Sequence, residues 1–395
     1  MKVKLFICHH PGSLLLYKNL IQIIRKYDKD TKIILFKVNH PYFRGFNFGY
    51  YGKYFDEIRE FHFIDYQKNF LKGFWKILIF QKKLKMAISN LLLNFEKIDL
   101  FLDDSAYLPI NIFLYNLSKQ KNIKNIIKFR MTDPELSYVK TDKLKTFLCN
   151  LYSFPFGHYK IKAISTLGGK FLNYIYVDKI PGIVFKIGSP ILSEENNLEH
   201  KGKNILPYPV SVEGSEGSSA AKKDMIIVLG KKSVFNDLSE YLPDYKIYVK
   251  KLTVLFDAIG DKYLDCELYY KPHPVDKGQI MPGIDTKKYN LFDDSVNTQI
   301  LIDKYRTRIK AIYAFSSSSL MSGSFFGISS YSFYRYLCNQ AGTERFNSYF
   351  NQNNLKSRFL YHISDLEEIG KIDKLERPKI DSEKLEKIYR KVLNV

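Results

Sequence analysis

The regular alternation of short apolar runs with longer amphipathic segments is the feature that most constrains how this chain can fold. The first unit is the strand-like run KVKLFIC (2–8), which precedes a helical pattern at 14–27 and a second strand at 31–38. The alternation continues with strands at 60–65, 98–104 and 125–131 and with helices at 69–95 and 107–120. Strands that alternate with helices of about ten or more residues predict a parallel sheet covered by helices on both faces.

A polar segment rich in Gly, Ser and Pro divides the alternation into two halves. Residues 195–223 lack hydrophobic periodicity, which is typical of a linker or mobile loop. The pattern then restarts, with strands at 224–230, 266–272 and 310–315, a helix at 246–260 and a charged amphipathic helix at 382–395. We therefore expect an α/β chain of two Rossmann-like domains facing across a cleft, residues 1–194 and 224–395, with the last helix able to pack back on the first domain.

The excess of basic residues indicates an anionic partner. The chain has 61 Lys and Arg against 41 Asp and Glu, a formal charge of +20, and such a positive field attracts nucleic acid, anionic lipid or an acidic polysaccharide. The candidates for polyanion contact are a lysine assigned to position 69, at the start of helix 69–95, together with Lys68, Lys72, Lys76, Lys82, Lys83, Lys85 and Arg130. The alternative is a composition generally rich in Lys, with the lysines of this helix on a solvated face.

The apolar segments and the cysteines favour a protein made and kept inside the cell. The sequence has no run of about 18 uncharged apolar residues that could span a membrane. Its N-terminal apolar run ends at once in His-His-Pro, as expected of a first strand and not of a signal peptide. The four cysteines are far apart and form no CxxC pair, which favours reduced thiols over disulfides or structural zinc.

A single histidine lies between two prolines at the end of a predicted strand, in KPHP (271–274). The carboxyl ends of parallel strands carry the ligand-binding residues of such sheets. Near neutral pH, His273 can donate a hydrogen bond or a proton to a phosphate, with Lys271 and Pro274 beside it. The alternative is a proline-restricted turn in which the histidine has no chemical role.

A run of four serines, FSSSSL (315–320), follows the next clear strand and precedes a segment that predicts the start of a helix. Hydroxyl and backbone N–H groups at a helix N-terminus bind phosphate, although serine runs are also common in loops. We expect the histidine and the serines to lie at adjacent strand ends and to bind one phosphate without a metal ion. With the loop after strand 224–230, the candidate phosphate ligands are Ser316, Ser317, Ser318, Ser319, Gly230 and Ser233.

Two carboxylate pairs in the first half could supply a general base. Asp103 and Asp104 end a predicted strand, and Asp133 and Glu135 follow the next strand in the loop TDPELSY. Both pairs would face the cleft of a parallel sheet, where burial raises a carboxyl pKa and lets the group accept a proton. The alternative for each pair is a local role, as the cap of helix 107–120 or as the start of a turn.

Strand–KPHP, strand–SSSS and an acidic loop in the first half together resemble the bacterial sialyltransferases of the GT-B fold that build lipooligosaccharide sialic acid and polysialic acid capsules. Those families share an acidic D/E-D/E-G motif, an HP motif and a serine motif. The resemblance implies that His273 assists the departing cytidine monophosphate (CMP) and that residues 316–319 bind its phosphate.

The acidic motif is where this sequence departs from the family pattern. DDS (103–105) matches the motif by its letters but lacks the glycine, whereas TDPELSY matches by its position after a strand. We favour Asp133 or Glu135 as the general base, with Asp104 or Asp103 as the second choice.

The function that the resemblance implies is an inverting, metal-independent and cofactor-free glycosyltransferase that moves sialic acid from CMP-sialic acid to a glycan or glycolipid acceptor. The positive charge favours an acidic acceptor, so the most specific expectation is a polysialyltransferase of capsule biosynthesis, in the cytoplasm and in peripheral contact with anionic lipid at the inner face of the cell membrane. The alternatives are a lipooligosaccharide monosialyltransferase, a teichoic-acid-type transferase with a CDP-activated polyol donor, and a nucleic-acid-binding protein. The last has no supporting RNA-binding or helix-turn-helix sequence, so we expect no nucleic acid partner.

Overall fold

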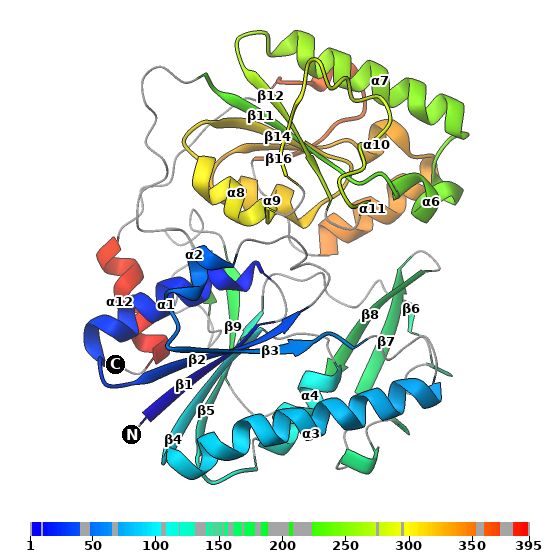
Figure 1. Cartoon of the computed structure of the whole chain (residues 1–395). Helices are drawn as coiled ribbons and strands as arrows, with labels where there is room; N and C mark the ends of the chain where they lie inside the picture. The colour runs from blue at the N-terminus through cyan, green and yellow to red at the C-terminus, as the bar shows by residue number, and fades with distance from the viewer. Residues whose placement is uncertain are drawn as a thin grey trace.

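The computed structural model describes residues 2–8, 11–39, 48–64, 70–103, 108–117, 119–130, 140–141, 143–144, 147, 150–151, 154–156, 161–167, 170–177, 183–188, 205–207, 223–273, 276–293, 296–352, 359–371 and 382–393. These residues form two parallel sheets, one in each half of the chain, and a small antiparallel sheet (Figure 1).

Seven of the described strands form the first sheet, in the order β10-β9-β5-β4-β1-β2-β3, and all of its strand pairs are parallel. The strands are β1 (Lys2–Cys8), β2 (Lys32–Asn39), β3 (Glu57–His62), β4 (Lys97–Asp103), β5 (Ile123–Arg130), β9 (Ile183–Gly188) and β10 (Ile205–Pro207). β1 is buried at every position after its first residue. Such continuous burial is typical of a strand with helices over both faces of its sheet.

Helices cover both faces of the first sheet. The helices of this half are α1 (Ser13–Tyr27), α2 (Gly49–Gly52), α3 (Phe70–Asn94) and α4 (Leu108–Leu117), with a 3₁₀ turn, η3 (Phe154–Phe156). Leu5 and Ile7 of β1 pack in one buried cluster with α3 and α4, whereas Phe6 packs in another with α1. Because successive side chains of a strand point to opposite faces, α1 lies on the face opposite to α3 and α4.

The C-terminal helix α12 (Ser382–Leu393) packs on α1, so the end of the chain contacts its first helix. Glu386 accepts hydrogen bonds from Tyr27 and from Lys26, whose Nζ lies 2.9 Å from Oε2. The guanidinium of Arg390 lies over the Tyr27 ring, 4.3 Å from its centroid. The last helix therefore covers the first domain, on the side of α1 (Figure 1).

The observed topology contains strands that the sequence analysis did not predict, among them β9 and the strands at 290–291, 329–332 and 360–362 of the second half. The chain between β5 and β9 contains a small antiparallel sheet, β6 (Lys140–Thr141), β7 (Ile161–Leu167) and β8 (Lys170–Val177), for which we had no expectation. Residues 205–207, inside the expected linker, form β10 and pair with β9. A three-residue strand is too short to carry a periodic pattern, so its pairing is not visible in the sequence.

The second sheet is also parallel throughout, in the order β13-β12-β11-β14-β15-β16. Its strands are β11 (Met225–Gly230), β12 (Glu267–Pro272), β13 (Asn290–Leu291), β14 (Ile309–Ala314), β15 (Ser329–Ser332) and β16 (Leu360–His362). Its helical elements are α6 (Val234–Leu238), η5 (Ser239–Tyr241), α7 (Tyr245–Lys262), α8 (Thr298–Tyr305), α9 (Ser318–Phe325), α10 (Tyr334–Leu337), α11 (Gln340–Gln352) and η7 (Leu366–Glu368).

The strand order of each parallel sheet reverses at one point. In the second sheet the chain first adds strands on one side of β11 and then continues on the other side with β14. In the first sheet the same reversal lies between β1 and β4. Ligands of doubly wound sheets bind at the carboxyl ends of the strands beside this reversal, so the topology itself marks where a site should lie.

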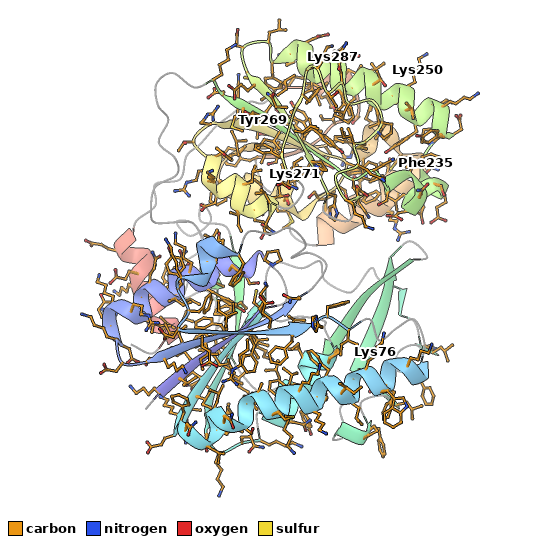
Figure 2. The ribbon with its side chains drawn as sticks, viewed as in Figure 1. Lys76, Phe235, Lys250, Tyr269, Lys271 and Lys287 are labelled. Carbon is orange, nitrogen blue, oxygen red and sulfur yellow. The ribbon has the colours of Figure 1, made fainter. Side chains whose placement is uncertain are left out.

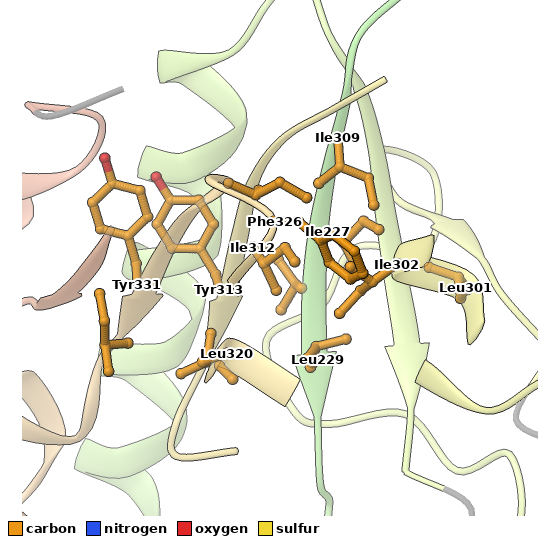
Figure 3. Close-up of a cluster of buried hydrophobic side chains, with 14 of the residues drawn as sticks. Ile227, Leu229, Leu301, Ile302, Ile309, Ile312, Tyr313, Leu320, Phe326 and Tyr331 are labelled. Atoms are coloured by element: carbon orange, nitrogen blue, oxygen red, sulfur yellow. The ribbon is translucent and has the colours of Figure 1, made fainter. Parts of the chain in front are cut away.

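The core of the second domain joins its sheet to α8 and α9 (Figure 3). Ile227 of β11 and Ile302 of α8 belong to this buried cluster. Gly323 lets α9 lie directly on the sheet, because a Cβ there would be 2.6 Å from Cδ1 of Ile312 and 2.7 Å from Oγ of Ser330. This close approach fixes α9, and with it the serine run at its start, against β14 and β15.

Three of the four cysteines are described: Cys8 is buried, Cys266 and Cys338 are partly buried, and no disulfide joins any two of these three. Cys149 lies outside the described residues. Within the described part of the chain, no helix combines the length and the apolar character needed to cross a membrane.

We expect Gly323→Ala to lower the free energy of unfolding by about 1–3 kcal/mol, because the added methyl group would push α9 off the sheet. The measurement is urea denaturation followed by circular dichroism. Gly260→Ala in α7 is the control, since a Cβ there meets only Cδ1 of Leu268, at 3.5 Å, and alanine favours a helix over glycine. Equal losses for the two variants would contradict the packing argument.

Candidate functional site

Three loops of the second domain leave the same edge of its sheet, each at the carboxyl end of a strand. β12 leads into His273, β11 into residues 231–233, and β14 into Ser316 and Ser317. Figure 2 shows β12 running from Tyr269 to Lys271 toward the first domain. The three loops therefore form one candidate site on the side of this domain that faces the other.

The prediction that the histidine and the serines follow adjacent strands is wrong in one respect. β11 lies between β12 and β14. Since neighbouring strands are about 4.8 Å apart, the ends of β12 and β14 are separated by roughly 10 Å, and the β11 loop lies between them. The reason is the strand-order reversal, which brings the first strand of the domain to the middle of the sheet.

His273 is neutral at pH 7 in the unliganded protein. Burial lowers the pKa of its imidazole to about 4, the ammonium groups of Lys231 and Lys271 act in the same direction, and the carboxylate of Asp276 opposes them. A neutral imidazole has one N–H donor and one acceptor nitrogen. The site can therefore offer a phosphate a hydrogen bond from His273, whereas a proton transfer from it requires that ligand binding first raise the pKa.

Asp276, which the sequence analysis did not select, joins the β12 loop to the β11 loop. Its backbone N–H donates to the carbonyl of His273 (2.9 Å), and its Oδ2 accepts the backbone N–H of Lys232 (2.5 Å). Its position in HPVD is typical of an Asp in a turn. Its partner is 44 residues away in the chain, so only the fold could identify Asp276 as a positioning residue.

Two of the predicted donor-binding residues have structural roles in the unliganded protein. Lys271 is 1% exposed, and its Nζ donates to the carbonyl of Pro272 at 2.8 Å. A Cβ at Gly230 would lie 2.1 Å from the hydroxyl oxygen of Tyr270, so only glycine fits at the end of β11. Lys271 contributes its charge from beneath the site, and Gly230 allows the two strands to pack.

The β11 loop brings a cation to the middle of the site. Lys231 Nζ donates to Oδ2 of Asp237 at 2.8 Å, and the hydroxyl of Ser233 donates to the same oxygen at 3.1 Å. These bonds hold the loop against α6. Lys231 is close enough to His273 to lower its pKa, so the two side chains would act on the same ligand. In the sequence, Lys231 belongs to the lysine pair of LGKKS (229–233). Only the order of the strands in the sheet shows that this pair lies between the His273 loop and the serine run.

The serine run forms the start of α9. Ser317 is its N-cap, and its Oγ accepts the backbone N–H of Ser319 at 3.2 Å. A hydroxyl that accepts a bond can still donate its own hydrogen. Ser316 precedes the cap, and only the backbone of Ser318 is described. The positive end of the α9 dipole therefore lies at the strand-order reversal, where it favours an anion.

The proposed general bases lie at the edge of the described structure. Asp104, Asp133 and Glu135 lie outside the described residues, and only the backbone of Asp103, the last residue of β4, is described. β4 borders the strand-order reversal of the first sheet, and β5 is its neighbour. The parallel strands β4 and β5 therefore end at the same sheet edge, and the choice between the two acidic pairs stays open. Pro274, beside the histidine, also lies outside the described residues.

The assignment of a lysine to position 69 is wrong. The residue at this position is Asn69, and the lysine of the stretch YQKNF is its neighbour Lys68. The amide of Asn69 is uncharged, so it can donate a hydrogen bond to an anion but cannot attract one over a distance. Asn69 is therefore withdrawn as a polyanion-binding candidate. Both Lys68 and Asn69 lie outside the described residues and precede Phe70, the first residue of α3, in the sequence.

The other predicted polyanion-binding lysines lie away from the three loops. Lys72, Lys76, Lys82, Lys83 and Lys85 are exposed on α3, which runs along the side of the first domain opposite to the second domain (Figure 1). For Arg130, the last residue of β5, only the backbone is described. Among the described residues, no group of three or more His, Cys, Asp or Glu side chains could hold a metal ion, and metal independence stays a prediction.

The chain has the GT-B fold, as predicted, with two Rossmann-like domains. No family model and no curated protein matches the sequence. Among solved structures, the GT-B domain of a sialyltransferase from Photobacterium damselae has a TM-score of 0.51 at 11% identity, covering 92% of this chain and 100% of that domain. A UDP-GlcNAc 2-epimerase from Methanocaldococcus jannaschii has a TM-score of 0.52 at 12% identity, with both chains covered in full. Identities this low show the fold alone.

The two partly buried histidines at this sheet edge give a pH dependence of stability. Burial lowers the pKa of His362, at the end of β16, from 6.5 to about 4, and Arg335 adds to this. The same shift applies to His273. Because the unfolded chain binds these protons more readily, the stabilisation is complete above pH 6.5 and is lost as the pH falls toward 4.

We expect lowering the pH from 7 to 5.5 to remove about 1 kcal/mol of unfolding free energy for each of these histidines. His362→Phe, whose ring can pack between Tyr334 and Phe350, should therefore lose about 1 kcal/mol less than the wild type over this interval. Urea denaturation at the two pH values measures the loss of unfolding free energy for each protein. The contributions of the other titrating groups are the same in both proteins and cancel when the two losses are subtracted. Equal losses in the two proteins would show that His362 titrates normally.

Proposed function

We propose that this chain is an inverting glycosyltransferase that moves sialic acid from CMP-sialic acid to an acidic glycan. The proposal rests on three features that lie at one edge of the second sheet: His273, the β11 loop with Lys231, and the N-terminus of α9. Each follows the carboxyl end of one of three neighbouring parallel strands. These strands border the strand-order reversal, where doubly wound domains bind the phosphates of nucleotides. The HP and serine motifs point to CMP as that nucleotide.

The proposed role of this group is to stabilise the departing CMP. As the bond between sugar and phosphate breaks, negative charge grows on the phosphate oxygens. The ammonium of Lys231, the N–H of His273 and the donors at the start of α9 can share that charge. Because a nearby anion favours the imidazolium form, the bound phosphate would raise the pKa of His273. The histidine could then donate its proton to the leaving oxygen.

The attacking group would come from the first domain. A carboxylate, Asp133 or Glu135 with Asp104 as second choice, would remove the proton from an acceptor hydroxyl. Attack on the face opposite to the phosphate inverts the anomeric carbon. The +20 charge of the chain supports an acceptor that is itself anionic, and a growing polysialic acid chain of a capsule is the most specific version. No metal ion is part of the proposal, since Lys231 and the α9 dipole supply the positive charge.

The direct test is CMP release from CMP-sialic acid in the presence of a sialylated acceptor. We expect His273→Gln to lower kcat by about a hundredfold or more, as loss of one proton donor and charge stabiliser does elsewhere. His362→Gln is the matched control, because it removes an equally buried histidine from a strand end farther from the reversal. Full turnover by His273→Gln would refute the proposed role, and Ala variants of Asp104, Asp133 and Glu135 would identify the base.

Two other donors test the rival reactions at the same site. The fold similarity to a UDP-GlcNAc 2-epimerase makes UDP-GlcNAc one of them, and CDP-glycerol tests the teichoic-acid-type alternative. We expect neither to be consumed. Consumption of either one without turnover of CMP-sialic acid would assign a different reaction to the three loops.

A second prediction concerns the protonation of His273. Its ring signals should titrate near pH 4 in the free protein and at a higher pH with saturating CMP, because the phosphate favours the imidazolium. Histidine-selective NMR over a pH series measures both midpoints. His362 serves as the internal control and should not move. Unchanged midpoints for both histidines would mean that the phosphate does not bind beside His273.

A further inference from the structure

Helix α3 has two apolar faces, and within the described part of the chain one of them packs on the first sheet while the other is exposed. Its buried side chains, Ile77, Phe80, Leu84, Ile88 and Leu91, pack on the first sheet. On the solvent side, Trp75 is 61% exposed, Ile79 53%, Met86 63% and Leu93 84%, whereas Leu78, 37% exposed, lies between this side and the buried face. Single exposed apolar residues are ordinary, but a helix packed on one face does not need four on the other.

The four exposed residues lie in one row along the helix. Successive helical residues are about 100° apart around the axis, so Trp75, Ile79, Met86 and Leu93 fall within an arc of roughly 40°. Their centre is nearly opposite to the buried Leu84. At about 1.5 Å per residue, the stripe runs for roughly 27 Å along the helix. We refer to these four residues as the α3 stripe.

Lysines border the α3 stripe on both sides. By the same geometry, Lys72, Lys76 and Lys83 lie on one side, and Lys82 and Lys85 lie on the other, with Lys82 about 20° from the edge of the stripe. All five are exposed, and Figure 2 labels Lys76 on the helix. The sequence of α3 contains no Asp or Glu, so no carboxylate of the helix itself neutralises this row.

We propose that the α3 stripe and its lysines dock the protein on an anionic lipid bilayer. An apolar row flanked by basic residues is the pattern of helices that lie in the membrane interface, where the apolar side chains enter the headgroup region and the lysines contact anionic headgroups. Tryptophan is enriched at this interface. Because the opposite face of α3 is held by the sheet, the helix would lie flat on the membrane as part of the folded domain.

The other occupants fit the stripe less well. An acidic polysaccharide would use the lysines but leave Ile79, Met86 and Leu93 in water. A second copy of the chain would cover the apolar residues but bring two rows of lysines together, and like charges repel. The bilayer satisfies both the apolar and the basic side chains. It also leaves the carboxyl edge of the second sheet free, since α3 lies away from that domain (Figure 1).

The experiment uses Trp75, which is the one tryptophan of the chain, as a probe built into the stripe. The full-length protein is mixed with vesicles of phosphatidylcholine alone and with vesicles that also contain phosphatidylglycerol. We expect a blue shift of the tryptophan emission, quenched by brominated lipid, only with the anionic vesicles. High salt should weaken it, because salt screens the lysines. No donor or acceptor is present, so the outcome is independent of the proposed reaction.

Two variants separate the apolar from the basic contribution. Ile79→Ser/Met86→Ser/Leu93→Ser keeps the probe and the charge, and Lys76→Gln/Lys82→Gln/Lys83→Gln keeps the stripe. Each should lower vesicle partitioning at least about tenfold, since each basic residue near an anionic surface contributes roughly fivefold and each buried apolar side chain a comparable factor. The control is Ile247→Ser/Val254→Ser, which removes two exposed apolar residues from α7 and should leave partitioning unchanged.

Three results would overturn the proposal. The first is the absence of an emission shift with anionic vesicles. The second is a shift without vesicles that grows with protein concentration, together with a dimer in sedimentation, which would assign the stripe to a second copy. The third is an equal shift with soluble polysialic acid and none with lipid, which would assign α3 to the polysaccharide. The vesicle and salt measurements use the wild type, so they stand even if a variant fails to fold.

Discussion

The parallel register of β12, β11 and β14 is the constraint on which the candidate site depends. Gly230 at the end of β11 pairs with Pro272 of β12, and Leu229 pairs with Ala314 of β14. The three strands thus end nearly in step, and each chain leaves the sheet within a residue or two of the others. The backbone hydrogen bonds between the strands therefore fix where the three loops begin. The side chains of these loops extend from the same sheet edge.

The charged side chains of this site are arranged as in a binding site for an anion, with lysines around it. Burial lowers the pKa of His273, and the charges of Lys231, in the β11 loop, and of the buried Lys271 add to this effect. Asp276 and Asp237 hold the loops through hydrogen bonds to Lys232 and Lys231. An anion arriving between these groups would gain attraction from the lysines and would also relieve their mutual repulsion, which gives the unliganded arrangement a physical reason.

The candidate phosphate site, the contact with α12 and the exposed apolar face of α3 lie on three different surfaces of the protein. The strand ends of the second sheet carry the candidate phosphate site, the α1 side of the first sheet receives α12, and α3 presents its unused apolar face on the far side (Figure 1). Such a separation allows a protein to be held at one surface while the loops of the other domain remain accessible. It also explains how α3 can be apolar on two faces without being a core helix.

The sequence by itself determined the secondary structure that local pattern encodes. The strands expected at 266–272 and 310–315 are observed at 267–272 and 309–314, because short segments rich in apolar and aromatic residues are typical of strands in a sheet covered on both faces. The same pattern was enough to predict two parallel sheets in two Rossmann-like domains, and the resemblance of the HP, serine and acidic motifs to bacterial sialyltransferases added the GT-B fold. It was also enough to select His273 and the serine run, since both directly follow strands.

Only the tertiary structure decided which of these segments meet. Hydrogen bonds between strands join residues far apart in the chain, so the position of β11 between β12 and β14, and the bond from Lys232 to Asp276, leave no local pattern. The same holds for burial. An apolar Trp75 or Leu93 reads as a core residue until the sheet is seen to cover the opposite face of α3. Local chemistry fixes what each segment can form, whereas non-local packing sets its neighbours, its exposure and the pKa of its side chains.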